Sequence, residues 1–154
     1  MQQLMILGVA LTGRDGSPVI VMEESAGGRF LPIPADPFQT EMLIRNFTEE
    51  NHNSSVSWLA ELLSTRPPQR ALLELNGNGD IHVRFAYRKQ NRGYALPLGE
   101  GLSLVKLLHT PLFAEEPLFV LCEHELQYLS HHTNFTENFL YLTPAQYASN
   151  IPII

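Results

Sequence analysis

The spacing of apolar residues divides the chain into predicted strands and helices. Two apolar, β-branched runs, 4–12 and 18–23, flank a turn of glycine and aspartate and predict a hairpin. A third run, 29–33, contains Pro32, which favours the end of a strand or the edge of a sheet. Residues 70–75 and 81–89 predict a second hairpin, and 81–89 alternates most regularly between apolar and polar positions. Residues 94–98 and 117–122 predict two further strands.

Helical spacing of apolar residues predicts three main helices. Asp36 offers a capping side chain and Pro37 suits the first helical position, so a helix is predicted over 37–48. Helices are also predicted over 56–64, after a pair of serines, and over 99–108. A shorter helix over 125–130 leads to an apolar tail, which we expect to pack on its own domain or on a neighbouring subunit.

These elements predict an α+β fold: a single domain with a mixed or largely antiparallel sheet of about seven strands, packed by three main helices. A chain of 154 residues is long enough to bury a core without metals or disulfides. Its apolar content of 44%, against 17% charged residues, is typical of a globular protein. We expect residues 1–122 to form the domain and residues 123–154 to add the last helix and the tail.

The composition of the chain limits where the protein can be located and what it can bind. No basic region followed by an apolar run opens the chain, and no stretch approaches the ~20 apolar residues that span a bilayer, so no membrane association is expected. Cys122 is the single cysteine, which excludes an internal disulfide, and a cytoplasmic location is expected. The formal net charge of −6 opposes long-range attraction of nucleic acid, so any such contact has to be local.

One basic cluster stands out, formed by Arg84, Arg88, Lys89 and Arg92. Arg84 and Arg88 alternate onto one face of the strand predicted over 81–89. Two interpretations remain open. The cluster is a phosphate-binding surface, or it is a solvated sheet face that ends in a charged hairpin tip.

Several short motifs, together with the order of the elements, resemble the bifunctional nuclease (BFN) domain family over about residues 5–120. The matching segments are Leu7-Gly8-Val9, Gly16-Ser17-Pro18-Val19, Glu23, Arg29-Phe30-Leu31-Pro32-Ile33 and Arg84. The resemblance implies the α+β fold and nuclease activity on RNA and DNA. These residues mostly belong to turns and core positions, so they support a shared fold better than a shared reaction.

The polar motifs of the BFN family are largely replaced. Its glutamate at the opening of the first helix corresponds to Gln39, with Glu41 two residues later. Its threonine–histidine–aspartate motif before the second helix aligns with residues 55–57, while His52 lies nearby without aligning. Its most recognisable stretch, which opens the third helix, aligns with residues 95–101, where Glu100 alone keeps a charge.

Phosphodiester hydrolysis requires an activated water and neutralisation of the phosphate, commonly by Mg²⁺ or Mn²⁺ held by oxygen ligands, or by Arg and Lys with a general base. Glu100 is the first candidate for a metal ligand or general base; it is equally placed to act as a helix-terminus acid. Glu23 and Glu41 are candidate additional metal ligands. His52 is a weaker candidate for acid–base work.

The spacing of cysteine and histidine residues gives little support for a zinc site. Cys122 and His124, followed by His131 and His132, match no standard zinc spacing. Two functional hypotheses remain. The chain is a divergent BFN-type nuclease that uses a divalent metal and binds nucleic acid, or it is an inactive BFN-fold binding or regulatory module. We expect the second to act as a homo-oligomer, through an exposed strand edge or through the tail.

Overall fold

A computed structural model describes residues 1–11, 17–48, 55–87, 90–131 and 139–142, and the backbone alone of 90–92 and 128–131. This part of the chain is α+β, with eight strands and five helices. The strands are β1 (Gln2–Ala10), β2 (Val19–Glu24), β3 (Phe30–Pro34), β4 (Arg70–Leu75), β5 (Ile81–Tyr87), β6 (Gln90–Pro97), β7 (Leu112–Ala114) and β8 (Phe139–Tyr141). The helices are α1 (Pro37–Thr48), α2 (Ser55–Leu63), α3 (Leu98–Leu108), α4 (Glu116–Leu121) and α5 (Glu123–His131).

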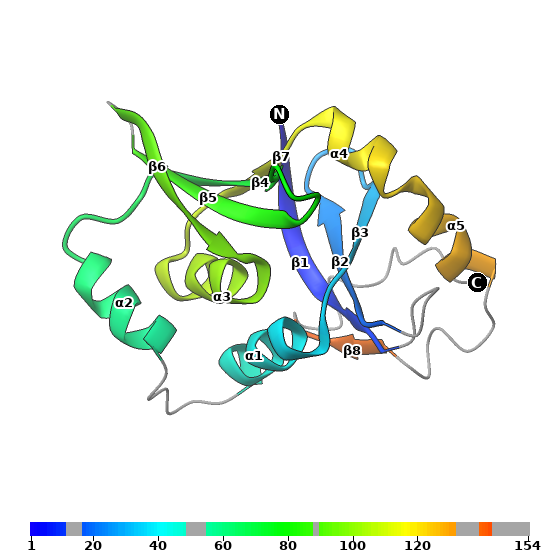
Figure 1. Ribbon diagram of the computed structural model, residues 1–154, viewed down its shortest axis with the longest axis horizontal. Coiled ribbons are helices and arrows are strands. Elements are labelled where there is room, and N and C mark those ends of the chain that lie inside the picture. Colours follow the sequence, from blue (N-terminus) through cyan, green and yellow to red (C-terminus); the bar gives the residue numbers. More distant parts are fainter. Residues whose placement is uncertain (12–16, 49–54, 88–89, 132–138, 143–154) are drawn as a thin grey trace.

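All the strands belong to one sheet, in the order β3-β2-β1-β7-β4-β5-β6, with β8 paired to β1 (Figure 1). Neighbouring strands are antiparallel except β4 and β7, which are parallel. The predicted hairpins are therefore confirmed as β1–β2 and β4–β5. The strand that contains Pro32 lies at the edge of the sheet, as its proline indicated.

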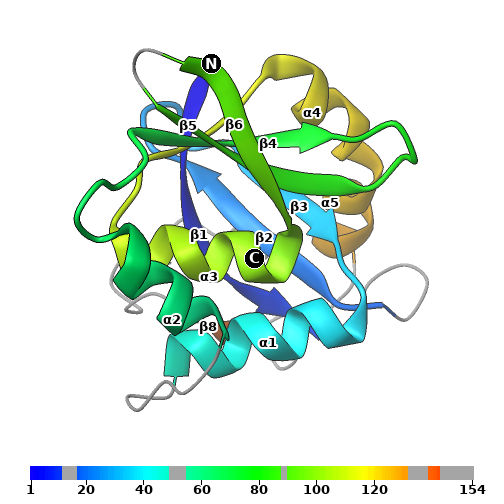
Figure 2. The same cartoon turned by 60° about the vertical axis from the view of Figure 1, so that its left-hand side comes forward.

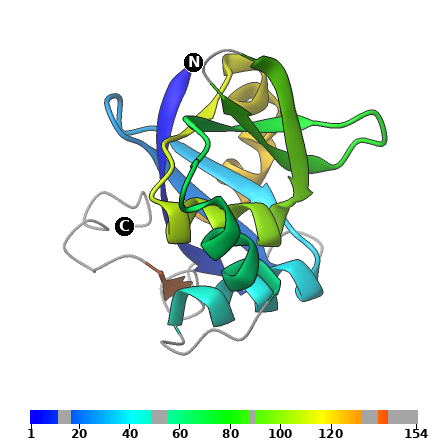
Figure 3. The same ribbon diagram turned by 90° about the vertical axis from the view of Figure 1, so that its left-hand side faces the viewer.

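Three helices gather on one side of the molecule. Helices α1 and α3 lie side by side (Figure 2), and α2 packs against α3, nearest the viewer in Figure 3. Leu102 and Leu104 of α3 are fully buried in the main core with Phe85 of β5. On the far side from α2, α4 and α5 follow one another, and α5 contacts the edge strand β3.

A second, smaller core lies on the opposite face of β1 and β2. It contains Leu7, Val21 and Phe139, the last contributed by β8. This arrangement explains the glycine of the Leu7-Gly8-Val9 motif. A Cβ added at Gly8 would contact the ring of Phe139 at 2.8 Å and the backbone oxygen of Leu140, so the close approach of β8 requires a residue without a side chain there.

The structure corrects the predicted strand at residues 117–122, which is wrong. This segment is the helix α4, and Pro117 occupies its first turn. A six-residue apolar run fits a buried strand and a short helix equally well, and a proline in the first turn favours the helix. The strand in this region is the preceding β7, three residues long and too short to show an alternating pattern. Strand β8 was not predicted either, and β6 begins at Gln90, four residues before its predicted start at residue 94.

The remaining predicted elements agree with the structure to within a few residues. Helix α1 has the predicted bounds, and α3 begins one residue before its predicted start. None of the helices in the described part of the chain combines the length and apolar character needed to cross a bilayer. Within the predicted tail segment, β8 pairs with β1 of the same chain, and residues 143–154 lie outside the described ranges.

Candidate functional site

Part of the predicted basic and acid–base set lies outside the described residues. His52, Arg88 and Lys89 belong to segments that the structure does not describe, and Arg92 is described by its backbone alone, in β6. The same holds for His132, and for the side chain of His131. These assignments stay predictions.

Arg84, on β5, is engaged by a carboxylate of its own sheet. Its Nε donates to Oε1 of Glu74 at 2.6 Å, and Nε2 of His82 lies 3.9 Å from the other oxygen of the same carboxylate. Val83 belongs to the main core, so Arg84 points to the other face of the sheet by alternation. The Arg84 side chain is 31% exposed, and the Glu74 carboxylate already balances its charge.

Glu100 lies in the first turn of α3, where the side chain of Gln39 reaches across from α1. The backbone N–H of Gly99 donates to Oε1 of Gln39 at 2.8 Å, and the N–H of Glu100 lies 3.4 Å from the same oxygen. These are N–H groups that no turn of the helix can satisfy. Gln39, which belongs to the neighbouring helix α1, therefore acts as the N-terminal cap of α3.

The three predicted metal-binding carboxylates are not brought together. Glu41 is exposed on α1 and forms an i,i+4 ion pair with Arg45 at 2.9 Å. Glu23 is buried on β2, and its strand partners Met5 and Phe30 pack on the smaller core, so it faces away from the main core that α3 enters. Among the described residues, no group of three or more His, Cys, Asp or Glu side chains is close enough to hold a metal ion. Glu23, Glu41 and Glu100 therefore do not form the set of oxygen ligands expected for a divalent metal.

A polar pocket of about 500 Å³ lies at the N-terminal ends of α1 and α3. Its polar lining comes from α1 and its preceding turn, and from the β4–β5 hairpin: Asp36, Gln39, Asn76, Asp80 and His82. Most of these groups already have structural partners. Asp36 Oδ1 accepts the N–H of Gln39 at 2.8 Å, and Asn76 Oδ1 accepts the N–H groups of Asn78 and Asp80.

The electrostatics of this pocket disfavour an anionic ligand. Two helix N-termini point at it, which would ordinarily attract a phosphate. Here Asp36 caps one of them with a negative charge and Gln39 caps the other, while the carboxylate of Asp80 adds a second negative charge to the wall. The N-terminal ends of α1 and α3 are thus capped by internal hydrogen bonds, and the wall of the pocket carries acids.

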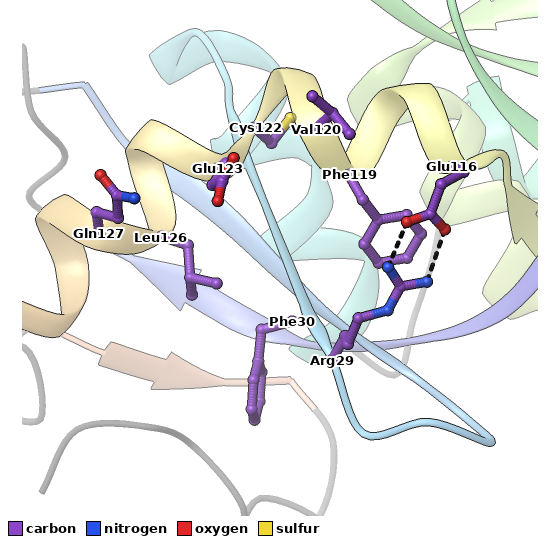
Figure 4. A pocket seen from close by; sticks show the side chains of 9 residues that line it. All are labelled: Arg29, Phe30, Glu116, Phe119, Val120, Cys122, Glu123, Leu126 and Gln127. Atoms are coloured by element: carbon purple, nitrogen blue, oxygen red, sulfur yellow. Dashed lines mark hydrogen bonds and ion pairs between the residues drawn. The ribbon is translucent and has the colours of Figure 1, made fainter.

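A second pocket, also about 500 Å³, lies between the start of β3 and helices α4 and α5 (Figure 4). We call it the α4–α5 groove, lined by Arg29, Phe30, Glu116, Phe119, Val120, Cys122, Glu123, Leu126 and Gln127. Arg29 clamps its two sides together. It bonds Glu24 through Nε at 2.6 Å and Glu116 through Nη1 and Nη2 at 2.6 and 2.9 Å, and it lies 4.3 Å from the centre of the Phe119 ring.

Three titratable groups of the α4–α5 groove, Arg29, Glu116 and Cys122, have displaced pKa values. The two hydrogen bonds from Arg29 lower the pKa of Glu116, and the Glu116 and Glu24 carboxylates raise the pKa of Arg29. Burial, together with the nearby Glu125 charge, raises the pKa of Cys122 to about 11. The Cys122 thiol is therefore protonated at neutral pH, which makes it a weak nucleophile.

Replacing Arg29 by methionine should lower the melting temperature at pH 7, because it removes the clamp and leaves the buried Glu24 carboxylate without its partner. Because folding lowers the pKa of Glu116, the stability that its ion pair with Arg29 contributes is fully present above the unfolded-state pKa of about 4.3. This stability is lost as the pH falls through the pKa of the folded state. The difference in melting temperature between wild type and Arg29→Met should thus shrink from pH 7 to pH 2.5. A difference that is constant over this range would contradict the ion-pair account. The exposed Arg70→Met variant is the control.

Sequence reasoning found the acid at α3 and missed both pockets. The cap at Asp36 was visible, because an aspartate before a proline marks a helix start. Asp80 and His82 carried only the signals of a turn and an alternating strand. The α4–α5 groove was hidden, because residues 117–122 were interpreted as a strand.

Comparison of the chain with models of known protein families gave no match, and comparison with curated proteins gave none either.

Proposed function

We propose that this chain is a binding module with a BFN-like fold and without nuclease activity. The observation that carries the proposal is the hydrogen bond from the Gly99 N–H to Gln39 Oε1. It joins Gln39, which the resemblance aligns with a glutamate of the family, to Gly99, which lies in the segment 95–101 that aligns with the family's most recognisable stretch. Both are used to cap a helix. A side-chain amide in this role holds α1 and α3 together and offers no base or metal ligand to a reaction.

Two other candidate residues support the same interpretation. Arg84 is paired with Glu74, and Glu41 is paired with Arg45. A nuclease needs either carboxylates that converge on a metal ion, or cationic groups that are free to meet the phosphate, together with a general base. The polar pocket at α1 and α3 offers Asp36 and Asp80 instead, which repel a phosphodiester.

One observation favours the alternative, a divergent nuclease. Glu100 is partly buried in the first turn of α3, next to the polar pocket, where a carboxylate is able to act as a base. The helix dipole accounts for the same placement without chemistry, because acids are favoured in the first turn of any helix.

The purified protein is expected to leave labelled single-stranded RNA and DNA uncut in Mg²⁺, in Mn²⁺ and in chelator. The Glu100→Ala variant, prepared in the same way, is the matched control for contaminating nucleases. Metal-dependent cleavage by the wild type that disappears in Glu100→Ala would overturn the proposal and establish a nuclease. Equal cleavage by both proteins would identify a contaminant.

The proposal also places the module in the cytoplasm as a homo-oligomer. Strand β6 ends the described sheet and has no strand partner on its outer side in the described part of the chain, which leaves an edge for a second copy. Light scattering at several protein concentrations should give a mass of at least two subunits. A single-chain mass at every concentration would remove this part of the proposal.

A further inference from the structure

We propose that the α4–α5 groove binds a basic amphipathic segment of a partner protein, in which apolar residues fill the groove and flanking Lys or Arg residues meet its acidic rim. This inference rests on the proposed function as a binding module and names the chemistry of what is bound.

The floor of the groove is largely apolar. Phe30 of β3 and Leu126 of α5 both line it, and the ring of Phe119 lies against the Arg29 guanidinium (Figure 4). Val120 lines the groove and is 63% exposed, although valine is usually buried. A volume of about 500 Å³, lined mainly by apolar side chains with a few polar groups, lies within the range of real binding sites.

The rim of the groove is acidic. Arg29 is its one lining cation, and Glu24 and Glu116 both bond to it, so the three together carry one excess negative charge. Glu123 lines the groove as well, and its carboxylate forms no ion pair with a described residue. No Lys or Arg follows Lys106 in the sequence, so residues 107–154 bring no cation to balance the rim.

This charge pattern selects among occupants. Nucleic acid is repelled by the carboxylates. The chain's own C-terminal residues 143–154 are rich in apolar side chains but contain no Lys or Arg, so they complement the floor and not the rim. A segment that presents apolar residues on one face and Lys or Arg on its flanks complements both, as in the binding of amphipathic helices by hydrophobic grooves. Opposite potentials on the two partners raise the rate of encounter and disfavour wrong partners.

The test uses the full chain and three fluorescein-labelled peptides of about 16 residues. The first has apolar residues at helical spacing with lysines between them, the second has glutamate in place of every lysine, and the third has the composition of the first in scrambled order. We expect the first to bind with a Kd of about 1–100 µM, and more weakly as salt is raised. The other two should bind at least about ten-fold more weakly, because each removes one half of the complementarity.

Two pairs of variants locate the binding. Glu123→Lys should weaken the lysine peptide about five-fold and strengthen the glutamate peptide, whereas Glu61→Lys, at an exposed position on α2, should change neither. Val120→Ser should weaken the lysine peptide, whereas Leu62→Ser, at an exposed leucine of α2, should not. All four substitutions are on exposed side chains, so the fold should survive them.

Three outcomes would overturn the inference. They are no binding of the lysine peptide, equal binding of the lysine and glutamate peptides, and loss of binding in Glu61→Lys as large as in Glu123→Lys. A chain that lacks residues 143–154 is compared with the full chain. If only the shorter chain binds, and it binds the lysine and glutamate peptides equally, the chain's own tail is the occupant of the groove. These outcomes are independent of the nuclease assay, so failure here leaves the proposed lack of nuclease activity untouched.

Discussion

Substitution of Gly99 by alanine is expected to lower the free energy of unfolding by about 2–4 kcal/mol. A Cβ at this position would clash with the backbone oxygen of Gln39 and lie 2.8 Å from its Oε1. Backbone cannot yield as a flexible side chain does, so α1 and α3 have to separate. Their separation also strains the capping hydrogen bond from the Gly99 N–H to Gln39 Oε1.

Gly77→Ala is the matched control, because a Cβ at Gly77 meets nothing within 4 Å and φ there is not in the left-handed region. It should change stability by less than about 1 kcal/mol, in either direction. Denaturant unfolding, analysed with a common m-value, gives the change in free energy of unfolding for each variant. For Gly99→Ala, the melting temperature should fall by roughly 4–16 °C. Equal stability of the two variants would show that α1 and α3 do not approach as closely as described.

Lys106→Met is expected to cost about 1–3 kcal/mol, unusually much for a lysine that is not fully buried. Its Nζ donates to the backbone oxygens of Asn46 and Phe47 at 3.0 and 2.9 Å, and it lies 4.7 Å from the centre of the Phe47 ring. These oxygens belong to the last turn of α1, where carbonyls have no partner within the helix. The lysine of α3 therefore satisfies the end of α1, although burial lowers its pKa.

Arg70→Met provides the comparison, since Arg70 is exposed on β4 and its loss should stay within about 0.5 kcal/mol. Hydrogen exchange adds a local readout. Amides in the last turn of α1 should lose protection in Lys106→Met and keep it in Arg70→Met. Unchanged exchange in α1, together with a small loss of stability, would mean that solvent replaces the lysine without penalty.

Much of the architecture was predictable because local signals agreed with the fold. The helix at Pro37–Thr48 has an aspartate cap, a proline at its first position and helical spacing, and it was predicted with correct bounds. The β4–β5 hairpin has a glycine- and asparagine-rich turn between alternating runs. Where a short segment lacked such signals, the prediction failed, as at α4, or was never made, as at β7 and β8.

The candidate site was less predictable, because its character depends on contacts between distant residues. Nothing near Gln39 in the sequence indicates that its amide would cap a helix 60 residues later. Arg84 is a phosphate-binding candidate when viewed by itself, and its carboxylate partner comes from the neighbouring strand. The clamp from Arg29 to Glu116 spans 87 residues, and without it the α4–α5 groove could not be recognised.

The sequence by itself determined the α+β class, the two hairpins and the three main helices. These properties follow from periodicity and from turn and capping residues, which act over a few positions. Only the tertiary structure decided which charges are paired, that Glu23, Glu41 and Glu100 do not converge, and where apolar residues form an acid-rimmed groove. Those properties depend on strand pairing and helix packing, which join residues that carry no sequence signal of each other's presence.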